Sequence, residues 1–187
     1  MLNYYSPMKE EKSYSGLTIK EISPIMKLNL RGKSREFLST IGKNINMILP
    51  MEANTSSTSD NYTSMWLSPD EWMLVSNNTV DKENNNYQIE ELLFNKISKN
   101  NLGAVTDVSD QFVMINLKGE KIFDLLSAGC PFNFNEFKTK KGAVTQTLLL
   151  QVDVIIHLKE INSVNLFVRR SFSEHLMSWI DDTASRL

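Results

Sequence analysis

The 187-residue sequence predicts an α+β domain made of two related halves, each with the order strand, helix, hairpin, helix. Two observations lead to this fold class. Stretches in which apolar and polar residues alternate, as in half-buried strands, are interspersed with stretches in which apolar residues recur at helical spacing. In addition, a short pattern of residues recurs at an offset of 87 positions.

The first half is expected at about residues 20–100, after a weakly ordered, flexible tail at residues 1–16. Its elements are, in order, a strand at 25–30, a helix at 34–41 that Gly42 ends, a polar loop at 51–64, a hairpin at 65–75, a second polar loop at 76–86 and a helix at 87–98. The helix at 34–41 is predicted because Phe37, Leu38 and Ile41 share one face.

The second half is expected at about residues 103–182, and both halves together form a single domain over residues 1–187. Its elements are a strand at 108–117, a helix at 122–128 that Gly129 closes, extended sequence at 145–159, a partner strand at 164–170 and a helix at 172–180.

The repeat relates the first strand and helix of the two halves. Asn29, Leu30, Gly32, Leu38 and Gly42 fall on Asn116, Leu117, Gly119, Leu125 and Gly129. The matched glycines carry the most weight, because each follows an element at a point where the chain reverses and an unhindered backbone is needed.

An acidic pair lies between two tryptophans in the stretch Trp66-Leu67-Ser68-Pro69-Asp70-Glu71-Trp72. Proline and aspartate suit the two corner positions of a type I turn, so Ser68 to Glu71 is predicted as a hairpin turn with the tryptophans in the flanking strands. The alternative is a catalytic pair of carboxylates. That role requires a pocket that separates their pKa values, and the tip of a turn does not provide one.

The bulk composition is that of an ordinary globular protein, with 41% apolar and 22% charged residues. A net charge of -2 and a pI near 5.8 give no general attraction for nucleic acid or for an anionic membrane. Cys130 is the only cysteine, so no internal disulfide can form, and neither a secretory signal nor a membrane span is recognised. A cytoplasmic location is therefore expected.

Residues that could carry chemistry all have a simpler interpretation. Cys130 follows the end of a predicted helix, where the helix dipole disfavours a thiolate, so a small buried residue is expected. His157 and His175 lack a second ligand at metal spacing. The segment Asp107-Val108-Ser109-Asp110 is predicted to cap a strand entrance. The scattered glycines form no phosphate-binding loop. We therefore expect no catalytic, cofactor-binding or metal-binding residue in this chain.

Arg169 and Arg170 lie at the junction between the last strand and the last helix. They could bind a carboxylate or phosphate, pair with acidic groups of a partner protein, or form an ion pair within the surface of this chain.

Several separated motifs resemble one family. The stretch from Trp66 to Trp72 resembles the Trp-Leu-Gly-Pro-Asp-Glu-Trp segment of the gamma subunit of heterotetrameric sarcosine oxidase, with Ser68 in place of the glycine. The other matching segments, in order, are Asp107-Val108-Ser109-Asp110, Gly129-Cys130-Pro131, Gln146-Thr147, and Val168-Arg169-Arg170-Ser171-Phe172 with Trp179 further on. The likeness covers most of residues 20–182.

This resemblance implies a function within a complex. Such bacterial oxidases have alpha, beta, gamma and delta subunits, and they demethylate sarcosine to glycine, pass the one-carbon unit to tetrahydrofolate and reduce oxygen. FAD, FMN and NAD are expected on the alpha and beta chains and zinc on delta. The resemblance implies a non-catalytic gamma subunit; a sister complex that acts on another N-methyl amine is an alternative.

The gamma subunit in turn resembles the folate-binding domain of glycine-cleavage T-protein, which agrees with two related halves. A free-standing folate-binding module is therefore a further alternative. However, the hairpin region that holds paired glycines and an acidic pair in T-protein corresponds to about residues 152–157 here. That region has no glycine pair and only Asp153 as an acid, so a catalytic folate site is not expected.

A non-catalytic subunit needs a docking surface, and Trp, Tyr, Phe, Met and Arg are enriched in such surfaces. The interface candidates are Trp66, Arg169 and Arg170. Because Trp72 is expected in the core, Trp66 should be the more exposed tryptophan. Alternation along the last strand places Arg170 on an apolar face with Leu166 and Val168, where it would need an acidic partner, so Arg170 is the leading candidate and Arg169 the second.

Overall fold

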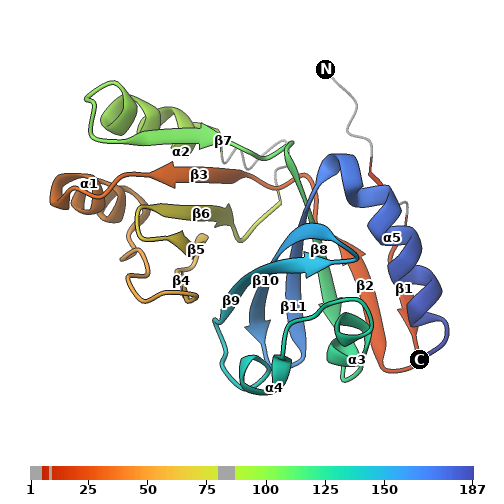
Figure 1. The fold of residues 1–187 in the computed structure, drawn as a ribbon. Coiled ribbons are helices and arrows are strands. Elements are labelled where there is room, and N and C mark those ends of the chain that lie inside the picture. Colours follow the sequence, from red (N-terminus) through yellow and green to blue (C-terminus); the bar gives the residue numbers. More distant parts are fainter. Residues whose placement is uncertain (1–5, 9, 80–86) are drawn as a thin grey trace. The chain divides into compact units, whose positions relative to one another are not determined.

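A computed structural model describes residues 6–8, 10–79 and 87–187 of the chain (Figure 1). The chain divides into two compact units, named here unit 1 (Met1–Ser23 and Gln111–Leu187) and unit 2 (Pro24–Asp110). Each unit has its own antiparallel sheet together with helices, which confirms the predicted combination of helices and strands. Parts of the predicted tail at 1–16 and of the predicted loop at 76–86 lie outside the described residues.

Unit 2 contains a five-stranded sheet with the strand order β4-β5-β6-β3-β7. Its elements are β3 (Lys27–Arg31), α1 (Arg35–Ile45), β4 (Ser56–Thr58), β5 (Tyr62–Ser68), β6 (Glu71–Ser76), α2 (Tyr87–Leu93), the π-helix η1 (Phe94–Ser98) and β7 (Ala104–Asp107). The buried core includes Leu30, Phe37, Trp72, Leu93 and Ile97. The helices of this unit therefore bury their apolar faces against β3 and β6, which provides the main favourable term in folding.

Unit 1 contains a six-stranded sheet with the strand order β1-β2-β8-β11-β10-β9. Its elements are β1 (Lys12–Tyr14), β2 (Leu17–Glu21), β8 (Phe112–Lys118), α3 (Ile122–Ser127), α4 (Phe134–Phe137), β9 (Val144–Leu149), β10 (Val152–Glu160), β11 (Ser163–Arg169) and α5 (Arg170–Ala184). Alternate residues of β8, β10 and β11 join residues of α3 and α5, such as Leu125 and Leu176, in one core cluster. Both helices thus pack against the same face of the sheet.

The strand at the start of each predicted half belongs to the sheet of the other half. β2 precedes β3 in the chain, but it pairs with β8 in unit 1. β7 precedes β8, but it pairs with β3 in unit 2. The unit boundaries, at Ser23–Pro24 and Asp110–Gln111, therefore differ from the predicted halves at 20–100 and 103–182. The predicted strand at 108–117 begins too early. Residues 108–111 connect β7 to β8, and β8 begins at Phe112.

Three further elements differ from the sequence prediction. The predicted stop at Gly42 is wrong. Ser34 caps the start of α1, but the helix continues through Gly42 to Ile45 and is capped by Asn46, whose φ of 51° is left-handed. The polar stretch 51–64 contains β4 and the start of β5. α4 was not predicted; it is held by tilted and edge-on contacts among Phe123, Phe132, Phe134 and Phe137.

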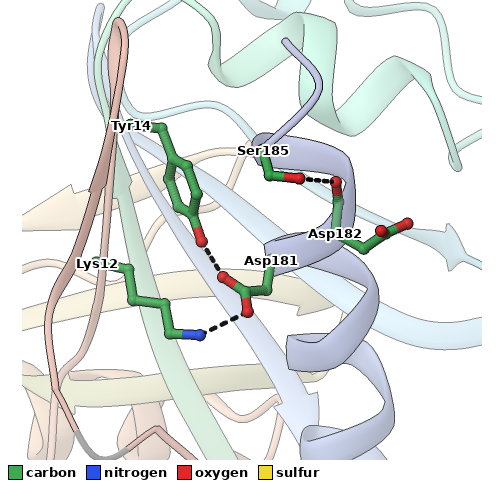
Figure 2. Close-up of polar contacts among 5 residues, drawn as sticks. All are labelled: Lys12, Tyr14, Asp181, Asp182 and Ser185. Carbon is green, nitrogen blue, oxygen red and sulfur yellow. Dashed lines mark hydrogen bonds and ion pairs between the residues drawn. The ribbon is translucent and has the colours of Figure 1, made fainter.

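Part of the predicted tail is ordered by contacts with the last helix. β1 pairs with β2, and Figure 2 shows two of its side chains converging on Asp181 of α5. Lys12 Nζ lies 2.6 Å from Asp181 Oδ2, and the Tyr14 hydroxyl donates a hydrogen bond to Asp181 Oδ1. The next residue, Asp182, instead accepts from Ser185 through its backbone carbonyl and pairs with Arg186. Asp181 therefore joins an edge strand to the helix.

Two glycines matched in the predicted repeat make similar backbone contacts in the two units. The Gly32 N–H donates a 3.0 Å hydrogen bond to the Asp70 carbonyl at the β5–β6 turn, and the Gly119 N–H donates one of 3.0 Å to the Asn162 carbonyl at the β10–β11 turn. Gly119 has a φ of 135°, and a Cβ on it would lie 2.2 Å from the Gly16 carbonyl oxygen. Glycine is thus required at this position by both backbone conformation and space.

His157 is a buried polar residue of β10, 3% exposed. Burial lowers the pKa of its imidazole to about 4, and the positive charge of Lys159 contributes to this shift. The folded protein therefore binds a proton at this position more weakly than the unfolded chain does, so the side chain is neutral near pH 7.

We predict that Asp181→Ala lowers the free energy of unfolding by about 1 kcal/mol, because β1 loses a partly exposed ion pair and a hydrogen bond. Urea unfolding measures the effect, and hydrogen exchange should show faster exchange of the β1 amides. Asp182→Ala is the matched control; it removes only an exposed pair and should cost less than about 0.5 kcal/mol. Equal effects of the two variants would contradict this role of Asp181.

We also predict a pH dependence that comes from His157. Its folded pKa lies below the unfolded value of 6.5, so its stabilising contribution is present above that value and is lost as pH falls toward 4. The free energy of unfolding should drop by about 2 kcal/mol more in the wild type than in His157→Gln between pH 7.5 and 5. Urea unfolding at both pH values, with His175→Gln as an exposed control, measures the difference. Parallel profiles for wild type and His157→Gln would refute it.

Candidate functional site

The acidic pair of the hairpin makes structural contacts at its tip. Ser68 lies opposite Glu71 in the β5–β6 register, which confirms the predicted turn. Glu71 Oε1 accepts a 2.7 Å hydrogen bond from Asn29 Nδ2, and Asp70 Oδ1 accepts one of 2.9 Å from Ser68 Oγ. The Arg31 guanidinium lies 3.9 Å from the Asp70 carboxylate and 4.0 Å from that of Glu71. Both carboxylates are thus engaged by neighbouring residues of unit 2, as expected for a structural turn.

The two tryptophans of the hairpin lie on the same face of the sheet. Trp66 and Trp72 are cross-strand partners. Trp72 is 1% exposed, packs at 6.1 Å from the Phe37 ring, and donates a 2.7 Å hydrogen bond from Nε1 to the Pro50 carbonyl. Trp66 is half-buried and packs against the same core. It is the more exposed of the pair, as predicted, but part of its ring contributes to the core of unit 2.

Arg169 lies at one end of the unit 1 sheet, on the face opposite the helices. It is the last residue of β11, pairs across the strands with Phe112 of β8, and places its guanidinium carbon 5.6 Å from the centre of that ring. Both residues line a groove of about 450 Å³ together with Leu148, Asp153 and Ile155. An exposed cation, an exposed carboxylate and an apolar floor thus occur in one groove.

Asp153 and Arg169 do not neutralise each other in this groove. Both are exposed, and no ion pair joins them within the described part of the chain. The arrangement can therefore accept groups of both charges from a binding partner. Sequence reasoning considered Asp153 only as a possible folate-site acid and missed Phe112. The register of β8, β10 and β11 would have been needed to bring them together.

The prediction that Arg170 extends the apolar face of the last strand is wrong. β11 ends at Arg169, and Arg170 is the first residue of α5, where the alternation of a strand no longer applies. Its backbone N–H donates a 2.8 Å hydrogen bond to Gln111, and its carbonyl accepts one of 2.7 Å from Ser173 Oγ. Arg170 is half-buried, whereas Arg169 is exposed. The geometry favours Arg169 over Arg170 as the more accessible cation.

The remaining candidates have structural roles or are isolated. Cys130 is 7% exposed and its sulfur lies 3.6 Å from the Thr147 hydroxyl, which confirms a small buried residue. Asp107 Oδ1 accepts a 2.8 Å hydrogen bond from the Ser109 N–H, and Ser109 Oγ accepts one of 2.9 Å from the Lys27 N–H, so this segment supplies the predicted capping side chains. His175 is exposed on α5. Within residues 6–8, 10–79 and 87–187, no three potential ligands form a metal-binding group.

No helix in the described part of the chain is long and apolar enough to span a membrane. Most of the candidate residues from the sequence make structural contacts within one unit or the other. Arg169, Asp153 and Phe112 line one groove of unit 1.

Comparison with known proteins agrees with the resemblance seen in the motifs. Residues 32–186 match the family described as "Sarcosine oxidase, gamma subunit family". No curated protein sequence matches the chain.

The solved structures that are similar to this chain include two of interest here. One is heterotetrameric sarcosine oxidase from Corynebacterium sp. U-96, with a TM-score of 0.80 and 21% identity over 91% of this chain and 84% of that chain. The other is glycine cleavage system aminomethyltransferase T from Bartonella henselae, with a TM-score of 0.65 and 13% identity over 92% of this chain and 50% of that chain. At these identities the likeness shows a shared fold. Because the family match extends over most of the sequence, the chain belongs to the sarcosine oxidase gamma subunit family.

Proposed function

We propose that this chain is the non-catalytic gamma subunit of a complex that oxidatively demethylates sarcosine to glycine and transfers the one-carbon unit to tetrahydrofolate. The observation that carries the proposal is the family match over residues 32–186. The likeness to a chain of heterotetrameric sarcosine oxidase supports it at the level of the fold. In this proposal the partners are alpha, beta and delta subunits, and the complex works in the cytoplasm.

The proposed non-catalytic role is supported by the chemistry of the candidate residues. The carboxylates of Asp70 and Glu71 are engaged in turn contacts, the thiol of Cys130 is buried, and the imidazole of His157 is buried with a lowered pKa. The Cys130 sulfur lies 3.6 Å from the Thr147 hydroxyl, which is not a general base. We propose that FAD, FMN, NAD, zinc and tetrahydrofolate are bound by the other subunits.

We further propose that the two units arose from one duplicated strand-helix-hairpin-helix element. Equivalent contacts support this. Gly32 and Gly119 each donate to a hairpin turn. Asn29 Nδ2 donates to Glu71, the first residue of β6, and Asn116 Nδ2 donates to Ser163, the first residue of β11. The strand orders β4-β5-β6-β3 and β9-β10-β11-β8 also correspond.

As the docking surface we propose the groove that contains Arg169, with Arg170 beside it in sequence and the half-buried Trp66 as a further candidate. An arginine stacked on an aromatic ring loses little conformational freedom on binding, and its guanidinium can still form two parallel hydrogen bonds with a carboxylate. Arg169 therefore has the properties of an interface anchor.

We predict that the chain expressed alone has no flavin absorbance and no oxidase activity, and that it copurifies with the alpha, beta and delta subunits when the four are coexpressed. Absorption spectra, oxygen uptake with sarcosine and affinity purification measure these properties. A yellow preparation of the single chain would contradict the non-catalytic role. Micromolar binding of tetrahydrofolate in calorimetry would instead favour a free-standing folate module.

We predict that Arg169→Ala lowers the recovery of partner subunits about 5- to 30-fold, as expected for loss of an interface anchor worth about 1 to 2 kcal/mol. The same variant should change the stability of the free chain by less than about 0.5 kcal/mol, because the side chain is exposed. Arg170→Ala should weaken assembly less. Arg186→Ala, at an exposed arginine paired with Asp182, is the matched control. Unchanged recovery with Arg169→Ala would remove it from the interface.

A further inference from the structure

A second groove occurs in unit 2, between α1 and the segment that follows it. Its volume is about 740 Å³, and it is bordered by Ile48 and Met51. These side chains are 84% and 64% exposed, and with Ile161 at 63% they are the most exposed large apolar side chains of the described residues. Two such side chains beside one groove form an apolar patch of the type that marks interaction sites.

The exposed side chains project from a fixed backbone. The Met47 N–H donates a 3.2 Å hydrogen bond to the Gly42 carbonyl at the end of α1. Leu49 is 3% exposed, within the core, and the Pro50 carbonyl accepts the 2.7 Å hydrogen bond from Trp72. Ile48 therefore lies between anchored residues, and Met51 directly follows the anchored Pro50. Such a preorganised surface loses little entropy on binding.

The charged residues of the groove are cationic. Arg35 and Lys43 of α1 belong to its lining, which contains no carboxylate. Neither forms an ion pair with a described residue. The nearest acids in sequence, Glu36 and Glu52, are exposed but are not part of the lining. The groove thus combines an apolar surface with two available positive charges.

We propose that this groove docks a segment of a partner subunit that carries apolar side chains flanked by carboxylates. The inference rests on the proposed function and names the chemistry of one partner contact. A second copy of this chain fits less well. In a twofold-symmetric contact the same surface would face itself, so that Arg35 and Lys43 would meet cations of like charge.

The test uses the full chain coexpressed with the alpha, beta and delta subunits. Ile48→Asp combined with Met51→Asp should reduce recovery of partner subunits at least tenfold, because carboxylates would replace the apolar contact. The melting temperature of the free chain should stay unchanged, since both side chains are exposed. Ile161→Asp, an equally exposed apolar residue of the β10–β11 turn, is the matched control and should retain wild-type recovery.

The charges are tested separately. Arg35→Glu combined with Lys43→Glu should lower recovery at low salt, and the difference from wild type should shrink at high salt because exposed charges are screened. Lys138→Glu, at an exposed lysine outside the groove, is the control.

The outcomes separate the two proposals. Wild-type recovery with the Ile48 and Met51 double variant would overturn the groove inference and leave the proposed function intact. A wild-type chain that binds no subunit would overturn both. If light scattering shows that the free chain dimerises and that the double variant does not, the groove would belong to a second copy, which also overturns the inference.

Discussion

The antiparallel pairing of β2 with β8 and of β7 with β3 is the constraint on which both units depend. β3 and β8 each have a hairpin strand on one side and need a second partner on the other, because unpaired backbone groups at a buried edge are costly. In unit 1 this partner is β2, which precedes every strand of unit 2 in the chain. In unit 2 it is β7, the last strand of that unit, which directly precedes β8 in the chain. Unit 1 is therefore discontinuous in sequence, because β2 precedes unit 2 and β8 follows it, whereas unit 2 is the continuous segment Pro24–Asp110. The chain crosses between the units at Ser23–Pro24 and Asp110–Gln111.

The hairpin between the two tryptophans connects several features of unit 2. Its turn accepts a backbone hydrogen bond from Gly32 and a side-chain hydrogen bond from Asn29, so the turn fixes the end of β3. From the same hairpin Trp72 reaches Phe37 of α1 and the carbonyl of Pro50. The acidic pair that first resembled a catalytic motif thus belongs to a framework that also positions the segment with Ile48 and Met51.

The charged and apolar groups that remain available lie on surfaces rather than in enclosed cavities. Arg169 and Asp153 face an open groove of unit 1, and Arg35 and Lys43 border the one in unit 2. The proposed non-catalytic role would depend on the shape and charge of such surfaces. The binding energy of an interface is concentrated in a few anchor residues. Arg169 on the Phe112 ring is suited to this role, and so are the preorganised side chains of Ile48 and Met51.

The sequence by itself determined the α+β class, the hairpin at Ser68 to Glu71, the burial of Trp72 and Cys130, and the family resemblance. These depend on local turn chemistry, on apolar periodicity and on short motifs, all of which are read from neighbouring residues. Only the tertiary structure decided that α1 passes Gly42, that β11 ends at Arg169 so that Arg170 starts a helix, and that β2 and β7 join the opposite sheets. Packing and pairing with distant strands set these features, and their energy depends on partners that local sequence does not specify.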